Sequence, residues 1–176
     1  MRKLIPFLAT CILGTLLHFL FDRTGGSLLV APFSGVNEST WEHMKLLYWP
    51  LIIVALVQWF LARRQGKIPC NFWCIKLMST LTGLTLIPVI YYTYNGCFGK
   101  SPDWLNISIF YVCAAAVFVL EARLFTGWRV KCRQGNTLAI AGLAILGFAF
   151  VYYTFCPPVL PLFQDPARGT FGLYQP

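Results

Sequence analysis

Apolar residues fall into five long stretches along the chain, and each stretch ends at charged residues, glycine or proline. The stretches are residues 4–21, 44–62, 75–94, 104–124 and 138–155. A helix needs about 20 apolar residues to cross a hydrocarbon core of about 30 Å. Because backbone polar groups in lipid must pair internally, segments of this length are expected to be helices. The pattern predicts an all-α, polytopic transmembrane bundle of five spans, forming one domain over residues 1–176.

The composition supports a lipid environment. The chain is 57% hydrophobic and 11% charged, whereas soluble domains carry about 25% charged residues. We therefore expect the protein to lie in a lipid bilayer, with the bilayer lipids as its main interaction partner. The net charge of +8 does not indicate a nucleic-acid partner, because the basic residues lie in short segments that flank the spans.

The distribution of Lys and Arg predicts the orientation, since cytoplasmic loops carry the excess of these residues. Ten of the 14 fall at one set of span ends: Arg2, Lys3, Arg63, Arg64, Lys67, Lys76, Arg123, Arg129, Lys131 and Arg133. The other four are Arg23, Lys45, Lys100 and Arg168. We therefore expect the N-terminus to be cytoplasmic and, after five crossings, the C-terminus to be external.

Two external segments have their own character. The loop after the first span contains an apolar run at residues 28–33, which is too short to span and is expected at the membrane interface. The tail, residues 156–176, is rich in proline and glycine and cannot form one helix, because proline lacks a donor and clashes inside a helix. We expect it to fold back onto the outer surface. Cys97 and Cys156 end two spans on this side, and we expect them to be close and bonded.

Acidic residues gather at the outer end of the spans. Only Glu121 is predicted on the inner side, and the other five acids are Asp22, Glu38, Glu42, Asp103 and Asp165. Both histidines, His18 and His43, lie among the first three acids. Ionisable groups within a span are costly and usually face the bundle interior or a wet cavity, so this cluster is the main functional indication.

Helical spacing groups these side chains further. His18 and Asp22 are four apart and share a helix face. Glu38 and Glu42 have the same spacing if the second span starts early. We therefore expect His18, Asp22, Glu38, Glu42 and His43 to converge in an outer pocket between the first and second spans.

Structural interpretations compete with a functional one. Ser39-x-x-Glu42 matches a capping box, in which Ser39 caps the helix and Glu42 reaches back to its amide. Trp41 and Trp104 at helix starts are most simply interface anchors. His43 then lies among the lipid head groups, and Glu121 is more simply paired than catalytic.

A metal site is the sharper interpretation. Imidazole and carboxylate ligands suit zinc, manganese or iron, and His18, Asp22 and His43 are the candidate metal ligands. Glu38 and Glu42 are the candidate catalytic carboxylates, acting as a base on bound water. No HExxH motif supports this assignment, and a proton relay would use the same residue types.

Three stretches carry a resemblance. They are His-Phe-Leu-Phe-Asp at residues 18–22, Asn-Glu-Ser-Thr-Trp-Glu-His-Met-Lys at 37–45, and Pro-Leu-Phe-Gln-Asp-Pro at 161–166. Together they look like a family of small bacterial integral membrane proteins of unknown function, over nearly the whole chain. The resemblance implies five spans in the bacterial cytoplasmic membrane and brings no activity. It also implies that the three stretches belong together, which adds Asp165 to the candidate catalytic carboxylates.

The leading functional hypothesis is a metal-assisted hydrolase or transferase that acts on a lipid or another amphiphile at the outer leaflet. The alternative is a transporter or substrate-binding membrane subunit, in which His18, Asp22 and Glu121 bind protons or a cation. That role needs polar residues through the whole depth, whereas these gather on one side. A third hypothesis is a non-catalytic assembly or sensor subunit.

Overall fold

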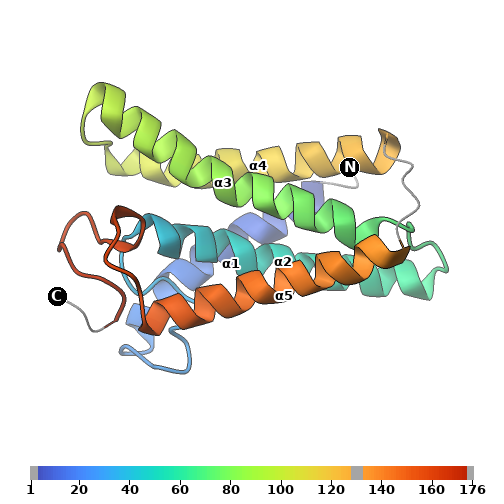
Figure 1. The fold of residues 1–176 in the computed structure, drawn as a ribbon, viewed down its shortest axis with the longest axis horizontal. Helices are drawn as coiled ribbons and strands as arrows, with labels where there is room; N and C mark the ends of the chain where they lie inside the picture. Colours follow the sequence, from blue (N-terminus) through green and yellow to red (C-terminus); the bar gives the residue numbers. More distant parts are fainter. Residues whose placement is uncertain (1–3, 128–132, 174–176) are drawn as a thin grey trace.

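The computed structural model describes residues 4–127 and 133–173, and those residues form five long helices and one short turn of 3₁₀-helix (Figure 1). The elements are α1 (Leu4–Arg23), α2 (Thr40–Arg64), α3 (Phe72–Phe98), α4 (Asp103–Gly127), α5 (Arg133–Phe155) and η1 (Pro161–Phe163). All five long helices are apolar and long enough to cross a membrane. The prediction of an all-α bundle with five spans is confirmed, and the protein is a multi-pass membrane protein.

Successive helices run in opposite directions. α1, α3 and α5 end where α2 and α4 begin, on the left in Figure 1, and the C-terminal tail lies there too. We call this the site end of the bundle. α2 passes through the middle and packs against all four other helices, which explains why ten of its residues are buried.

Close helix packing depends on glycine at defined crossings. A Cβ atom on Gly83 of α3 would clash with Val117 Cγ2 of α4 and would lie 3.3 Å from Leu47 Cδ2 of α2. Small residues are favoured between membrane helices because they let the backbones approach. Gly83 therefore sets the distance at which α3 meets α4 and α2.

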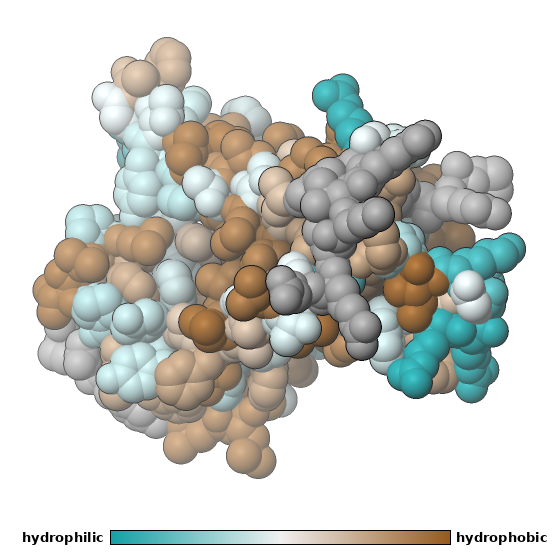
Figure 2. Space-filling model, turned by 45° about the vertical axis from the view of Figure 1, so that its right-hand side comes forward, coloured by the Kyte–Doolittle hydropathy of each residue, from teal (hydrophilic) through white to brown (hydrophobic). Residues whose placement is uncertain are grey.

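The outer surface is largely apolar. Figure 2 shows hydrophobic side chains along the flanks of the helices, while the most hydrophilic side chains gather at the end opposite the site end. In α1 the exposed apolar side chains are Leu4, Ile5, Leu8, Ile12, Leu16, Phe19 and Leu20. A lipid-facing surface accounts for them, since lipid tails are as apolar as these side chains.

The C-terminal tail folds back onto the start of α2, as predicted. The Phe163 ring of η1 packs on Trp41 with ring centroids 4.7 Å apart, and Gln164 bridges to Phe171. Trp41 also packs on Phe150 of α5, with a centroid distance of 4.5 Å. These contacts leave Trp41 half-buried, so it packs inside the protein more than an interface anchor needs to. Trp104 is 66% exposed, as an anchor would be.

The expected bond between Cys97 and Cys156 is absent, and both are exposed free thiols. α3 and α5 cross and then diverge toward the site end (Figure 1), so the ends that carry these cysteines separate. Equal distance from the membrane centre does not make two helix ends neighbours.

Labelling of single cysteines tests the orientation. In a cysteine-free background, Arg168→Cys should react from outside with an impermeant maleimide, whereas Arg64→Cys should react only after the membrane is opened. Both positions are exposed, at opposite ends of the bundle. External labelling at residue 64 would contradict the orientation predicted from Lys and Arg.

The crossing at Gly83 can be tested within one helix. Gly83→Ala should destabilise the folded protein by about 1–3 kcal/mol, because the added methyl group overpacks the contact with Val117. Gly96→Ala, also in α3, is the control, since a Cβ there meets nothing within 4 Å. Denaturant unfolding in detergent micelles provides the measurement. Equal stability of the two variants would contradict the close crossing.

Candidate functional site

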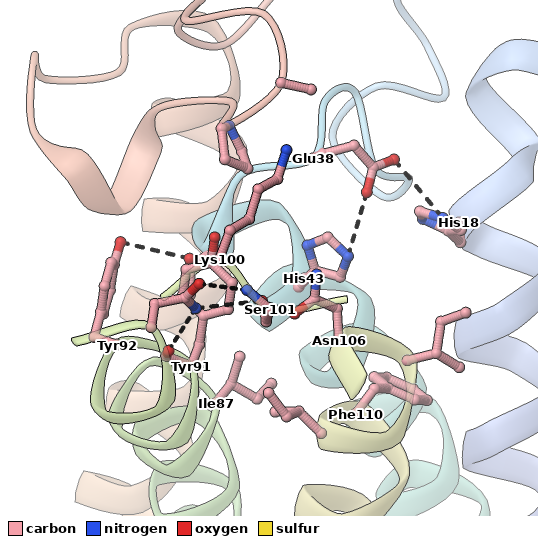
Figure 3. A pocket seen from close by; sticks show the side chains of 16 residues that line it. His18, Glu38, His43, Ile87, Tyr91, Tyr92, Lys100, Ser101, Asn106 and Phe110 are labelled. Carbon is pink, nitrogen blue, oxygen red and sulfur yellow. Dashed lines mark hydrogen bonds and ion pairs between the residues drawn. The ribbon is translucent and has the colours of Figure 1, made fainter. Parts of the chain in front are cut away.

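A cavity of about 680 Å³ opens at the site end. Its walls come from α1, the start of α2, the last turns of α3, the connection to α4, the first turns of α4 and the tail (Figure 3). Polar side chains lie around the upper part in Figure 3, and Ile87 and Phe110 lie lower. The cavity therefore has a polar region and an apolar region.

Glu38 lies between the two imidazoles (Figure 3). Its Oε1 is 3.8 Å from His18 Nε2, and its Oε2 is 3.6 Å from His43 Nε2. The two imidazole centroids are 5.7 Å apart. The side chains are 55% exposed for Glu38, 31% for His18 and 26% for His43, so all three are open to the cavity.

The backbone of α2 fixes the tautomer of His43. Its Nδ1 donates to the Ser39 carbonyl oxygen at 2.9 Å, because a carbonyl can only accept. The other nitrogen, Nε2, faces Glu38 and carries the lone pair of the neutral imidazole. A fixed second hydrogen bond of this kind orients an imidazole for proton transfer.

Ser34 fixes the turn of α1 that carries His18. Its hydroxyl accepts from the Phe21 amide at 2.9 Å and donates to the Leu17 carbonyl oxygen. In a regular helix these two backbone groups would pair with each other. The loop thus inserts one side chain into the hydrogen-bond ladder of α1 beside His18.

Glu42 does not belong with Glu38, His18 and His43, and it does not line the cavity. It is 2% exposed, and its Oε2 lies 2.5 Å from Lys45 Nζ and 3.1 Å from the Val36 amide. Glu38 and Glu42 were expected to share a helix face if the second span started early. That condition is not met, because α2 begins at Thr40 and helical spacing does not apply to Glu38.

Lys45 completes a buried network around that carboxylate. Its Nζ also donates to the Ala31 carbonyl oxygen and to Thr154 Oγ1, each at 2.8 Å. The pair therefore joins the loop before α2, α2 itself and α5. Glu42 is here a structural partner of a buried cation.

The capping prediction holds in part. Ser39 is the N-cap of α2 and accepts from the Glu42 amide at 3.4 Å. The reciprocal bond is replaced, because the Ser39 amide donates to Asn37 Oδ1 at 2.9 Å while the Glu42 carboxylate turns to Lys45.

Asp22 and Asp165 border the cluster without lining the cavity. Asp22 is exposed at the end of α1, and the imidazole Nε2 of His18 faces Glu38 instead. Asp165 is 2% exposed and accepts from the amides of Ala167 at 2.8 Å, Arg168 at 3.2 Å and Glu38 at 3.4 Å. It ties the tail to the residue at the centre of the cluster.

The predicted metal ligands are only partly brought together. Within residues 4–127 and 133–173, no three His, Cys, Asp or Glu side chains are arranged to hold a metal ion. His18 and His43 approach one carboxylate, and that carboxylate is Glu38 rather than Asp22.

Several cavity residues were not predicted from the sequence. Ser101 precedes α4, while Asn95 and Asn106 lie near facing ends of α3 and α4, and Lys100 is in the connection. The available signal was a pair of amide side chains near facing ends of two consecutive spans. Spacing along the chain does not show that these ends face His18.

Comparison with known proteins gives a family and no activity. A family model described as a family of unknown function, DUF6512, matches residues 2–173. The chain belongs to this family. No curated protein and no solved structure matched.

A second buried ion pair in this family member lies away from the site end. Lys76 Nζ is 2.6 Å from Glu121 Oε1 and 2.6 Å from Gln58 Oε1. It joins α3, α4 and α2. The simpler interpretation of Glu121 as a paired residue is confirmed.

The Glu42–Lys45 pair can be tested by removing one partner or both. Glu42→Gln should cost about 3–5 kcal/mol of folding free energy, because it leaves the Lys45 ammonium buried without its carboxylate. The double variant Glu42→Gln with Lys45→Met should cost less than the single one. Unfolding in detergent measures both, with the exposed Glu38→Gln as a control expected to change stability by at most about 1 kcal/mol. A double variant less stable than Glu42→Gln would contradict the pairing argument.

Proposed function

We propose that this protein is an enzyme of the bacterial cytoplasmic membrane that hydrolyses, or transfers a group from, a lipid or another amphiphile at the outer leaflet. The observation that carries the proposal is one carboxylate, Glu38, placed between His18 and His43 in a cavity with an apolar lower wall. The apolar wall is important because an amphiphile needs polar surroundings for its head group and apolar surroundings for its chain.

The size and lining of the cavity support this substrate class. Small-molecule sites usually measure about 300–1,000 Å³ and are mostly apolar with a few polar groups, and about 680 Å³ lies within that range. Ile87, Ile109 and Phe110 supply apolar wall for a chain. The imidazoles and Glu38 are then beside the head group.

The geometry suits general acid–base chemistry. His43 Nε2 takes a proton from water, while the Ser39 carbonyl holds Nδ1–H and Glu38 stabilises the resulting imidazolium. The water oxygen forms the new bond to the head-group carbon or phosphorus, and the bond to the leaving oxygen breaks. Protonated His18 gives its proton to that oxygen. Asp165 acts by positioning Glu38 through its backbone amide.

A metal-assisted form of the same reaction uses the same residues. His18, Glu38 and His43 offer ligand types that suit zinc, manganese or iron, and a metal held there would supply a more acidic bound water. This form requires the three side chains to move, because no such group in the described residues is arranged to hold a metal ion. Metal analysis separates this form from the metal-free one.

Transport is less well supported. The core between the two ends consists largely of apolar side chains such as Leu47, Leu51, Leu84 and Val117, and Glu121 is engaged with Lys76. A role as an assembly or sensor subunit predicts no turnover.

Turnover of a lipid extract tests the proposal. Purified protein in lipid nanodiscs should consume a lipid species, seen by mass spectrometry, and Glu38→Gln and His43→Asn should slow this by about 10²–10⁴-fold, the usual contribution of a general base. Asp22→Asn is the matched control, an exposed carboxylate at the same end that does not line the cavity, and should leave the rate unchanged.

Metal content is measured on the same samples. One bound metal per chain that is lost in His18→Asn and His43→Asn supports the metal-assisted form, and turnover without metal supports acid–base catalysis alone. Equal product formation by wild type and Glu38→Gln would contradict the role of Glu38, and no turnover by wild type would contradict the enzyme hypothesis.

A further inference from the structure

A chain of hydrogen bonds on one wall of the cavity fixes the direction of a side-chain amide. Asn95 Nδ2 donates to the Tyr91 carbonyl oxygen at 2.7 Å and to Ser101 Oγ at 3.3 Å. The Ser101 amide donates to Asn95 Oδ1 at 2.7 Å. Both ends of the Asn95 amide are therefore used within this wall.

The direction of the next bond follows. Since Ser101 Oγ accepts from Asn95, its own hydrogen points to Asn106, whose Oδ1 is 2.7 Å away. Ser101 is buried, at 4% exposure, so solvent does not compete for that hydrogen. The oxygen of Asn106 is thereby used, and its NH₂ group is the end left for the cavity that Asn106 lines.

Other donors lie along the same cavity. Lys100 is exposed and lines it, and in Figure 3 its side chain extends toward the level of Glu38. The ion pairs at the site end, within the described part of the chain, join Glu38 and Glu42 to His18, His43 and Lys45 and do not include Lys100. Glu38 is the one acid among the lining residues.

The cavity thus offers hydrogen-bond donors in addition to its single carboxylate. Lys100 and the Asn106 amide donate, and each imidazole becomes a donor when protonated. Groups of this kind form strong, charge-assisted hydrogen bonds to phosphate or carboxylate oxygens. Ile107 and Phe110 are apolar lining residues of the same cavity, and Phe110 lies in its lower part in Figure 3.

We infer that the cavity binds an amphiphile with an anionic head group, such as a phosphate ester, held by Lys100 and the Asn106 amide with its chain over Ile107 and Phe110. This inference rests on the proposed function and narrows its substrate class. A free phosphate shares the head-group chemistry and lacks the chain.

Native mass spectrometry of the full chain provides the test, with three lipids of identical acyl chains as probes: phosphatidic acid, phosphatidylcholine and diacylglycerol. Phosphatidic acid should bind about tenfold more tightly than diacylglycerol, which lacks the phosphate, since one charge-assisted hydrogen bond contributes about that factor. It should also bind more tightly than phosphatidylcholine, whose choline cation cancels the net negative charge of the head group. Lys100→Ala should lose this preference, and Lys100→Arg should keep it.

Asn106→Asp tests the direction of the amide. This variant keeps an oxygen that accepts from Ser101 and replaces the NH₂ donor with a negatively charged oxygen. It should therefore weaken the binding of phosphatidic acid by about tenfold or more. Arg23→Ala is the matched control, because Arg23 is an exposed cation at the same end that does not line the cavity. Lys100→Ala alone decides the question if the Asp variant fails to fold.

The outcomes separate this inference from the proposed function. If the three lipids bind equally and turnover still depends on Glu38, the inference of an anionic head group is overturned and the proposed function stands. If inorganic phosphate displaces phosphatidic acid at a comparable concentration, the ligand is a free anion and the inference of a lipid is overturned. If wild type binds none of the three lipids and also turns over no lipid extract, both proposals are overturned.

Discussion

The buried ion pair between Glu42 and Lys45 organises the site end. A charge inside a membrane protein must be paired, because an isolated buried charge costs several kcal/mol. Lys45 meets this requirement by reaching the Ala31 carbonyl and Thr154 as well as Glu42, so that the loop before α2 and the end of α5 are held against one side chain. Glu42 also binds the Val36 amide, which fixes the chain just before Glu38.

This constraint explains why the candidate site contains a single carboxylate. Because Glu42 is engaged with Lys45, only Glu38 remains to meet His18 and His43. Asp165 then fixes Glu38 through its amide and leaves the Glu38 side chain free to face the imidazoles. Glu42 and Asp165 therefore fix the backbone around Glu38, and the exposed Glu38 side chain is the carboxylate that faces the imidazoles.

The spans could be predicted from the sequence because a helix that crosses lipid needs apolar side chains along about 20 consecutive residues. The convergence of His18 and His43 was also predicted, since each lies near an end of a helix in one antiparallel pair. The role of Glu42 could not be predicted, because it depends on whether α2 starts at Thr40 or earlier. The Asn95–Ser101–Asn106 chain of hydrogen bonds and the separation of Cys97 from Cys156 depend on the lateral arrangement of helices, which hydropathy does not report.

Helix length gives the cavity its place relative to the membrane. α3 has 27 residues, about 40 Å at 1.5 Å per residue, whereas α1 has 20, about 30 Å. A hydrocarbon core of about 30 Å matches the length of α1, and α3 exceeds that thickness by about 10 Å. Asn95 lies in the last turn of α3, Lys100 and Ser101 follow that turn, and Ile87 lies two turns before Asn95. The proposed amphiphile requires this order of the two walls: its head group lies beside the polar side chains at the end of α3, and its chain lies beside Ile87, nearer the middle of the helix.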